Sequence, residues 1–236
     1  MILPFDFTGG ELLLIDKSID WTSFDAVNKV RRLISRQLGK KLKVGHAGTL
    51  DPKATGLLLI CTGAMTKKIN DLVGLDKEYT GTMFMGATTP SFDSETEINQ
   101  KFETGHLTSE LILSATKQFT GTIMQTPPQF SAKMVDGKRA YLSARMNKVV
   151  KIEPVTITIY EFEITKIAIP EIHFRVVCSK GTYIRSLVSD FGQALGSGAY
   201  LTSLRRTRIG NYAVDDALSV IQFEALLNTF SQESDG

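Results

Sequence analysis

Short apolar runs and stretches of alternating polar and apolar residues predict the strands of this chain. They cover residues 11–16, 57–61, 80–86, 155–169, 172–176 and 201–212. Several of these stretches follow one another through turns, with no helical segment between them. This order favours a mixed, largely antiparallel sheet over a doubly wound parallel one. We therefore expect an α/β fold of the α+β type, in which helices flank a long mixed sheet.

Apolar residues at helical spacing predict the helices. The clearest stripe follows Thr22 and Ser23, either of which can cap the helix, and it consists of Phe24, Val27, Val30, Leu33 and Ile34. Gly39 is a natural stop for this helix. Further helices are expected over residues 65–73, 111–119, 139–145 and 184–195.

The remaining segments are predicted from composition and from helix-start signals. Residues 88–107 are rich in Thr, Ser, Asp and Glu with little periodicity, so we expect a flexible surface segment there. Near the end of the chain, Asp215 or Asp216 can cap a last helix that continues through Phe230.

The composition is that of an ordinary soluble globular protein, with 42% hydrophobic residues, 22% charged residues and a net charge of +2. Because the chain is nearly neutral, any affinity for phosphate must come from local basic clusters. The clusters are Arg31, Arg32, Arg36, Lys40, Lys41 and Lys43, and then Arg205, Arg206 and Arg208. Phosphate contacts and a merely solvated basic surface are both open for them.

Cysteine usage and hydropathy indicate the compartment. Cys61 and Cys178 each lie in an apolar run, and neither has a second Cys or a His at the spacing of a metal site. We expect buried free thiols in a reducing compartment, and no metal. No apolar stretch approaches the length of a membrane span, and the N-terminus does not resemble a signal peptide. The expectation is a cytoplasmic protein with no membrane partner.

Residues 43–52 are the strongest candidate for a functional loop. Two glycines in this stretch permit backbone conformations that other residues avoid, and Pro52 excludes Asp51 from helical geometry. The expected result is a tight loop that presents the carboxylate of Asp51 and the imidazole of His46. A plain turn with one polar histidine is the alternative.

Four segments of the chain share a pattern with a known family. The loop reads Gly45-His46-Ala47-Gly48-Thr49-Leu50-Asp51-Pro52, continued by Ala54-Thr55-Gly56-Leu57-Leu58. The later segments are Lys77-Glu78-Tyr79, then Cys178-Ser179-Lys180-Gly181-Thr182-Tyr183-Ile184-Arg185, then Leu204-Arg205-Arg206-Thr207. Together they resemble the motifs of the TruB-type tRNA pseudouridine synthases, in the family's order and over most of the chain.

The resemblance implies the pseudouridine synthase fold, with a catalytic cleft across the middle of a long mixed sheet. It also implies an isomerase that converts uridine 55 of the tRNA T-loop into pseudouridine. This reaction breaks the bond between ribose C1′ and N1 of the base and rejoins the ring through C5. No atom is gained or lost, so no cofactor is expected. The expected partner is the T-arm of tRNA, bound by a monomer that needs no protein partner.

The resemblance also assigns the catalytic residues. Asp51 is the catalytic carboxylate, either as a covalent nucleophile or as a base that abstracts a sugar proton. Arg185 matches the residue that pairs with this aspartate. Ionisation in a dry pocket requires such a cation, because burial alone raises a carboxylate pKa by up to about 3–5 units. Tyr79 matches the tyrosine that stacks on the target base and is placed to take the C5 proton.

Five further residues match positions that bind the substrate. His46 matches the residue that stacks in the RNA loop once the target base has swung out. Leu204 matches the apolar residue beside that base, and Tyr183 helps to hold the pocket or serves the core. Lys17 and Lys77 match positions that support the pocket or backbone contacts rather than catalysis.

The chain departs from the family pattern at two places. Residues 17–23 usually read Lys-Pro-x-Gly-x-Thr-Ser, but here Ser18 replaces the proline and Asp20 the glycine. Asp tolerates the left-handed conformation better than most residues, so the turn can survive. Many members also carry a C-terminal RNA-binding, PUA-like domain. We expect a catalytic domain over residues 1–212, then a helix and frayed tail over 213–236, without a complete second domain.

Two other functions remain open. One is a non-catalytic RNA-binding or RNA-folding module on the same scaffold, and the other is a related synthase that acts on another RNA. A pure binder has no need to keep Asp51, Arg185 and Tyr79 together. His46 within its Gly-His-Ala-Gly segment favours the enzyme that is specific for the T-loop.

Overall fold

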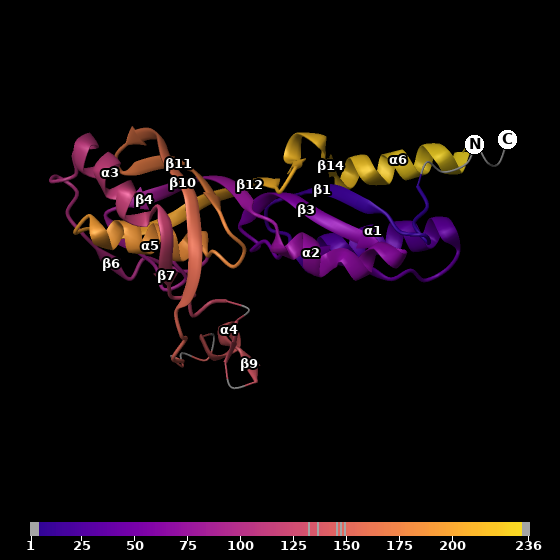
Figure 1. The fold of residues 1–236 in the computed structure, drawn as a ribbon, viewed down its shortest axis with the longest axis horizontal. Coiled ribbons are helices and arrows are strands. Elements are labelled where there is room, and N and C mark those ends of the chain that lie inside the picture. The colour runs from indigo at the N-terminus through magenta and orange to yellow at the C-terminus, as the bar shows by residue number, and fades with distance from the viewer. Residues whose placement is uncertain are drawn as a thin grey trace. The chain divides into compact units, whose positions relative to one another are not determined.

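The computed structural model describes residues 5–131, 133–135, 137–144, 146, 148 and 150–232. The chain divides into two units, called here the first unit (Met1–Lys77 with Arg205–Gly236) and the second unit (Glu78–Leu204). Two strands, β4 (Lys77–Met85) and β12 (Ala199–Ile209), contain the points at which the chain passes from one unit to the other (Figure 1).

The sheet of the first unit is mixed. Its strands follow the order β14-β1-β3-β12, where β14 is Leu218–Ser219, β1 is Leu12–Lys17 and β3 is Ala54–Thr62. β1 runs antiparallel to β3 and parallel to β14. Two short strands complete it, since β2 (Val44–Ala47) pairs with β3 and β13 (Tyr212–Ala213) pairs with β12. The strands expected at residues 11–16 and 57–61 are confirmed.

Helices cover both faces of this sheet. They are α1 (Ser23–Leu38), α2 (Ile69–Gly74) and α6 (Val220–Gln232), with 3-10 turns η1 (Gly63–Lys68) and η3 (Val214–Asp216). η1 and α2 together occupy the helical segment expected at residues 65–73.

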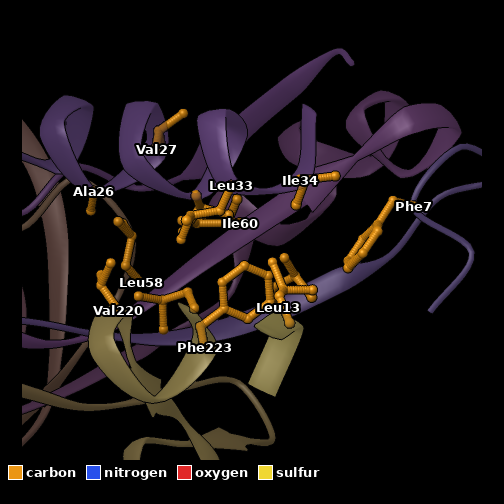
Figure 2. Close-up of a cluster of buried hydrophobic side chains, with 13 residues drawn as sticks. Phe7, Leu13, Ala26, Val27, Leu33, Ile34, Leu58, Ile60, Val220 and Phe223 are labelled. Atoms are coloured by element: carbon orange, nitrogen blue, oxygen red, sulfur yellow. The ribbon is translucent and has the colours of Figure 1, made fainter. Parts of the chain in front are cut away.

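Strand β3 is buried on both of its faces, which explains its continuous apolar run. Leu58 and Ile60 belong to a cluster with side chains of β1, α1 and α6 (Figure 2). Leu57, Leu59 and Cys61 alternate with them and belong to a second cluster, which includes residues of α2 and η3. Both cysteines of the chain are buried and neither forms a disulfide, as expected.

Helix α1 begins and ends as its sequence predicts, but the expectation that Phe24 belongs to its apolar stripe was wrong. Thr22 caps the helix in a reciprocal capping box with Asp25, and Gly39 ends it in the left-handed conformation with φ 64°. Phe24 is 64% exposed, and Ala26 is buried on the inner face instead. Phe24 fits the helical spacing, but it lies in the first turn and is exposed.

The start of the last helix differs from the expectation that Asp215 or Asp216 caps it. Both aspartates lie in the 3-10 turn η3, and α6 begins only at Val220. The intervening strand β14 pairs with β1, which delays the helix. Ser219 and Gln222 then form the cap, because each side chain accepts a hydrogen bond from the other residue's backbone N–H.

The sheet of the second unit follows the order β12-β4-β11-β10-β7, with β7 at Gly121–Gln125, β10 at Val155–Ala168 and β11 at Glu171–Cys178. β10 is antiparallel to both of its neighbours. The long strand expected at residues 155–169 is confirmed, and its pairing with β11 shifts register at two places. The short strand pairs are β5 (Ala87–Thr88) with β6 (Gln100–Lys101) and β8 (Met134–Val135) with β9 (Lys138–Arg139).

The helices of the second unit are α3 (Ser109–Ala115), α4 (Ala140–Ala144) and α5 (Ile184–Ala194), with the 3-10 turn η2 (Thr116–Phe119). Phe119, Phe162 and Phe191 meet edge to face and join η2, β10 and α5. The helix expected at residues 139–145 is observed as α4, and Arg145 lies outside the described residues.

Residues 88–107 were wrongly expected to be a surface segment throughout. The side chains of Thr89, Ser91 and Asp93 are buried, and their polar groups form hydrogen bonds with one another and with the backbone.

The expectation of a large mixed sheet flanked by helices is confirmed. In the described part of the chain, no helix is both long enough and apolar enough to span a membrane.

We expect Gly56→Ala to destabilise the first unit more than Gly39→Ala does. Both glycines have positive φ, so either change costs about 1–2 kcal/mol of conformational strain. A Cβ at Gly56 would also lie 2.3 Å from the carbonyl oxygen of Arg206, whereas nothing lies within 4 Å of one at Gly39. That clash adds about 1–3 kcal/mol. Denaturant unfolding of the two variants measures the difference, and equal losses would contradict it.

Candidate active site

The loop that carries Asp51 connects two antiparallel strands. β2 and β3 pair from Val44↔Thr62 to Ala47↔Leu59, and the loop lies between them. Gly48 has φ 92°, which confirms the positive φ expected there. After the loop, the N–H of Ala54 donates to the carbonyl of Asp51 at 3.0 Å. Asp51 itself is half-buried, so the loop holds its carboxylate at the edge of the protein interior.

Helix α1 and the turn before it hold the second half of this loop. The buried Ser23 hydroxyl accepts from the N–H of Leu50 at 2.8 Å and donates to the carbonyl of Leu50 at 3.1 Å. The N–H of Asp20 donates to the carbonyl of Pro52 at 2.9 Å. The backbone on both sides of Asp51 is therefore tied to one neighbouring segment.

Arg206 on β12 holds the first half of the loop. Its side chain is 1% exposed, and its Nε donates to the carbonyl of Leu57 at 2.8 Å. Its Nη2 and Nη1 donate to the carbonyls of Gly48 and Thr49 at 3.1 and 3.4 Å. The possibility that Arg206 contacts phosphate is therefore wrong, because the guanidinium points inward. The neighbouring Arg205 forms a two-pronged ion pair with Asp16.

Lys17 is a second buried cation close to this loop. Its Nζ donates to the carbonyls of Ser18 at 2.9 Å and Trp21 at 2.7 Å, which closes the turn after β1. In that turn Asp20 adopts φ 64°, so the turn survives the replacement of the family glycine. The pKa of Lys17 is lowered to about 8, chiefly by burial; attraction to Asp51 opposes this shift, and repulsion from Arg206 adds to it.

His46 on β2 faces the same group of charges. Burial holds the pKa of its imidazole below the usual value, and Arg206 acts in the same direction against a hydrogen bond with the backbone of Gly48. The buried Nδ1 atom has no hydrogen-bond partner among the described residues. Burial of the ring therefore favours its neutral form.

Lys77 is buried at the end of the first unit's N-terminal segment. Its ammonium donates to the carbonyls of Val73 at 2.7 Å and Leu75 at 2.5 Å, where helix α2 ends. This position satisfies carbonyls that the helix leaves unpaired and suits a cation at a helix C-terminus. The geometry agrees with a supporting role for Lys77.

In the second unit, Arg185 is fixed in the first turn of α5. Its side chain is 4% exposed, and its Nε lies 3.6 Å from Oδ2 of Asp93. Its Nη1 and Nη2 donate to the carbonyls of Ser91 at 3.1 Å and Phe130 at 2.9 Å. Asp93 is fixed in turn by the Ser91 hydroxyl at 2.6 Å and the N–H of Glu95 at 2.9 Å.

The other candidate residues of the second unit also have defined places. The side chain of Gln125 accepts from the N–H of Tyr183 at 2.8 Å and donates to its carbonyl at 3.1 Å, which seats the start of α5. Tyr79 is buried on β4, and Leu204 is half-buried on β12.

The structure thus groups the expected site residues by unit. The first unit contains Lys17, His46, Asp51 and Lys77, and the second contains Tyr79, Tyr183, Arg185 and Leu204. Pairing between Asp51 and Arg185 stays a prediction.

Sequence reasoning missed two residues of this arrangement. Asp93 lies in the segment that was expected at the surface, and no periodic signal marks it. Arg206 was counted with its two basic neighbours. On β12 the burial does not alternate regularly, so the strand pattern gave no reason to separate Arg206 from Arg205 and Arg208.

Comparisons with known proteins define the class of this chain. Residues 35–184 match the family model of the "TruB family pseudouridylate synthase (N terminal domain)". Residues 185–236 match that of the "tRNA pseudouridylate synthase B C-terminal domain". The fold and these matches identify the class as pseudouridine synthases, which are isomerases.

Relatives of known name identify the family within this class. The "tRNA pseudouridine synthase B" of Flavobacterium johnsoniae is 58% identical, over 95% of this chain and 99% of the relative. The protein of the same name from Phocaeicola vulgatus is 53% identical, over 94% of this chain and 95% of the relative. The chain belongs to the TruB family of pseudouridylate synthases.

Solved structures agree with this assignment. A chain in the crystal structure of a Cbf5–Nop10–Gar1 complex is 28% identical with a TM-score of 0.73, and the match covers 97% of this chain and 57% of that one. A chain in the structure of an H/ACA RNP bound to a substrate RNA containing 2′-deoxyuridine is 26% identical with a TM-score of 0.69, over 97% and 56%. This chain therefore spans little more than half of each solved chain.

We expect the stability of the wild type relative to Lys17→Met to rise with pH between about 8 and 10.5. In that window the folded state has released the Lys17 proton while the unfolded state still binds it, so stability increases with pH. Below the window the buried charge weakens the fold, and above it the penalty is gone. Denaturant unfolding of both proteins across this pH range measures the difference. A constant difference would show that burial does not displace this pKa.

Proposed function

We propose that this protein isomerises uridine 55 in the T-loop of tRNA to pseudouridine, with Asp51 as the catalytic carboxylate. The observation that carries the proposal is the loop around Asp51, whose backbone is tied down on both sides by Ser23, Asp20 and Arg206. A catalytic group must be held within a fraction of an ångström of its productive position. The names of the 58% and 53% identical relatives support tRNA as the substrate.

The reaction needs one carboxylate near the sugar and the base. Asp51 attacks the nucleoside or abstracts a sugar proton, and the bond from C1′ to N1 breaks. When the ring rejoins through C5, the bond to Asp51 is broken again or the sugar proton is returned. The C5 proton must then leave, and N1 gains one, so atoms balance without a cofactor. We assign removal of the C5 proton to Tyr79, and packing beside the base to Leu204.

Arg185 is the cation that we assign to Asp51. Its guanidinium is already aligned by Asp93 and by the carbonyls of Ser91 and Phe130, so little conformational entropy is lost when it meets a further carboxylate. Pairing with Arg185 would keep Asp51 ionised after the substrate has excluded water. Tyr183 acts by seating the first turn of α5.

His46 is assigned to the RNA loop. Burial lowers the pKa of its imidazole, and the half-exposed ring has the flat face that suits stacking on a base. Lys17 and Lys77 support the backbone around the site. We further propose that the enzyme works in the cytoplasm as a monomer on free tRNA, and that its catalytic domain covers residues 1–212.

The direct test is to incubate the protein with an unmodified tRNA transcript and map the pseudouridines formed. Modification of position 55 alone is expected. Modification at other positions, or only in another RNA, would favour a related synthase. Binding without any modification would favour a non-catalytic RNA-folding module.

Asp51→Asn should abolish turnover while leaving tRNA affinity and folding stability near those of the wild type. The amide is nearly the same size as the carboxylate, but it can neither attack nor accept the proton. Single-turnover kinetics and a filter-binding assay separate the two effects. Residual activity above a few per cent of the wild-type rate would contradict the catalytic role of Asp51.

An isolated T stem-loop should be modified almost as well as full-length tRNA. The assigned contacts of His46, Tyr79 and Leu204 all address the target base and its own loop. Comparison of kcat/KM for the two RNAs tests this expectation. A loss of more than about a hundredfold, which is about 2.7 kcal/mol of transition-state binding, would mean that important contacts lie outside the T-arm.

A further inference from the structure

Arg206 has the largest fully buried side chain among the residues that the structure describes. All three of its side-chain hydrogen bonds described above end on backbone carbonyls, those of Leu57, Gly48 and Thr49. Two of these carbonyls belong to the loop that precedes Asp51. A buried cation is expensive, and an apolar side chain of similar volume often stabilises a core equally well. Core packing alone therefore does not account for an arginine here.

Two glycines lie beside Arg206, one at its backbone and one at its guanidinium. At Gly56, a Cβ would lie 2.3 Å from the carbonyl oxygen and 2.7 Å from the amide nitrogen of Arg206, so only glycine allows β3 and β12 to approach this closely. At Gly48 a Cβ would lie 3.5 Å from Nη1 of Arg206, which is an ordinary contact, so the glycine is favoured there by its φ of 92°. Gly56 thus makes room for the backbone of Arg206, and Gly48 provides the turn whose carbonyl accepts from its guanidinium.

Ser23 is the second anchor of the same loop. Its hydroxyl bonds to both the N–H and the carbonyl of Leu50, the residue directly before Asp51. Arg206 therefore fixes residues 48 and 49 by their carbonyls, and Ser23 fixes residue 50 from helix α1. Three consecutive residues before the carboxylate have their backbone groups held by side chains from elsewhere in the first unit.

We propose that Arg206 and Ser23 are positioning residues that together clamp the loop and set the direction of the Asp51 carboxylate. The proposal rests on the catalytic role of Asp51 given under Proposed function. Neither residue is assigned a contact with the RNA or the reacting atoms. Their effect is transmitted through the backbone, so it belongs to the chemical step and not to the affinity for tRNA.

The test compares Arg206→Lys and Ser23→Ala with the wild type in single-turnover assays on unmodified tRNA. Lysine keeps the charge but cannot reach three carbonyls at once, and alanine removes only one hydroxyl. We expect the rate at saturating enzyme to fall at least tenfold in Arg206→Lys and at least fivefold in Ser23→Ala. The dissociation constant for tRNA should change less than threefold in both.

Two control variants separate positioning from general stability. Val30→Ala weakens the core of the first unit without touching the loop. Thr66→Ala removes a buried hydroxyl that donates to the carbonyl of Gly63 at 2.8 Å, in the same unit. Both are expected to lower the melting temperature while keeping the wild-type rate at 25 °C. The proposal would be overturned if the single-turnover rates of Arg206→Lys and Ser23→Ala equalled those of the two control variants.

Hydrogen exchange gives a measurement that does not depend on activity. The amides of Leu50 and Ala54 are bonded to Ser23 and to the carbonyl of Asp51. In Arg206→Lys both should exchange at least ten times faster than in the wild type, while amides of helix α6 keep their protection. Unchanged exchange at both positions would overturn the clamp. If Arg206→Lys does not fold, Ser23→Ala decides by the same two measurements.

Asp51→Asn distinguishes failure of this proposal from failure of the proposed function. If Asp51→Asn is inactive while Arg206→Lys and Ser23→Ala turn over at the wild-type rate, only the clamp is refuted. If Asp51→Asn retains activity, the catalytic assignment itself fails, and the exchange data alone then report whether the loop is clamped.

Discussion

The burial of two cations constrains the loop that carries Asp51. Lys17 and Arg206 are almost completely removed from water, and an unsatisfied charge there would cost on the order of several kcal/mol. Both donate instead to backbone carbonyls, Lys17 in the turn after β1 and Arg206 in the loop and β3. Hydrogen bonds to charged groups contribute about 1.5–3 kcal/mol each, so displacement of either backbone segment is costly.

The second unit also contains a buried arginine, but its hydrogen-bond and ion-pair partners differ from those of Arg206. Arg185 is also buried, but it has a buried carboxylate, Asp93, as well as two carbonyl partners. Its orientation is therefore fixed by an ion pair before any substrate arrives. Arg206 positions backbone, whereas Arg185 is itself held in position. This difference fits a structural role for the first arginine and the proposed direct role in the site for the second.

The sequence predicts those elements whose signals are local. The buried strand β3, the cap of α1 at Thr22 and the left-handed Asp20 all follow from short patterns, and each is observed. The failures come from tertiary pairing. Strand β14 pairs with β1 and so moves the start of α6 away from Asp215, which no local signal reveals. Arg206 is buried because of what lies across from it on β3, and its own neighbours in sequence resemble a solvated basic run.

The two departures from the family motif at residues 18 and 20 become understandable from the role of Lys17. The turn after β1 is closed by the Lys17 ammonium, which binds the carbonyls of Ser18 and Trp21. A carbonyl is present whatever side chain residue 18 carries, so a proline is not required there. Asp20 adopts the conformation that glycine would, and the exposed ion pair of Asp20 with Lys53 contributes only about 0.2–1 kcal/mol. The buried lysine, more than the turn residues, therefore maintains the turn whose Asp20 N–H holds Pro52, the residue directly after Asp51.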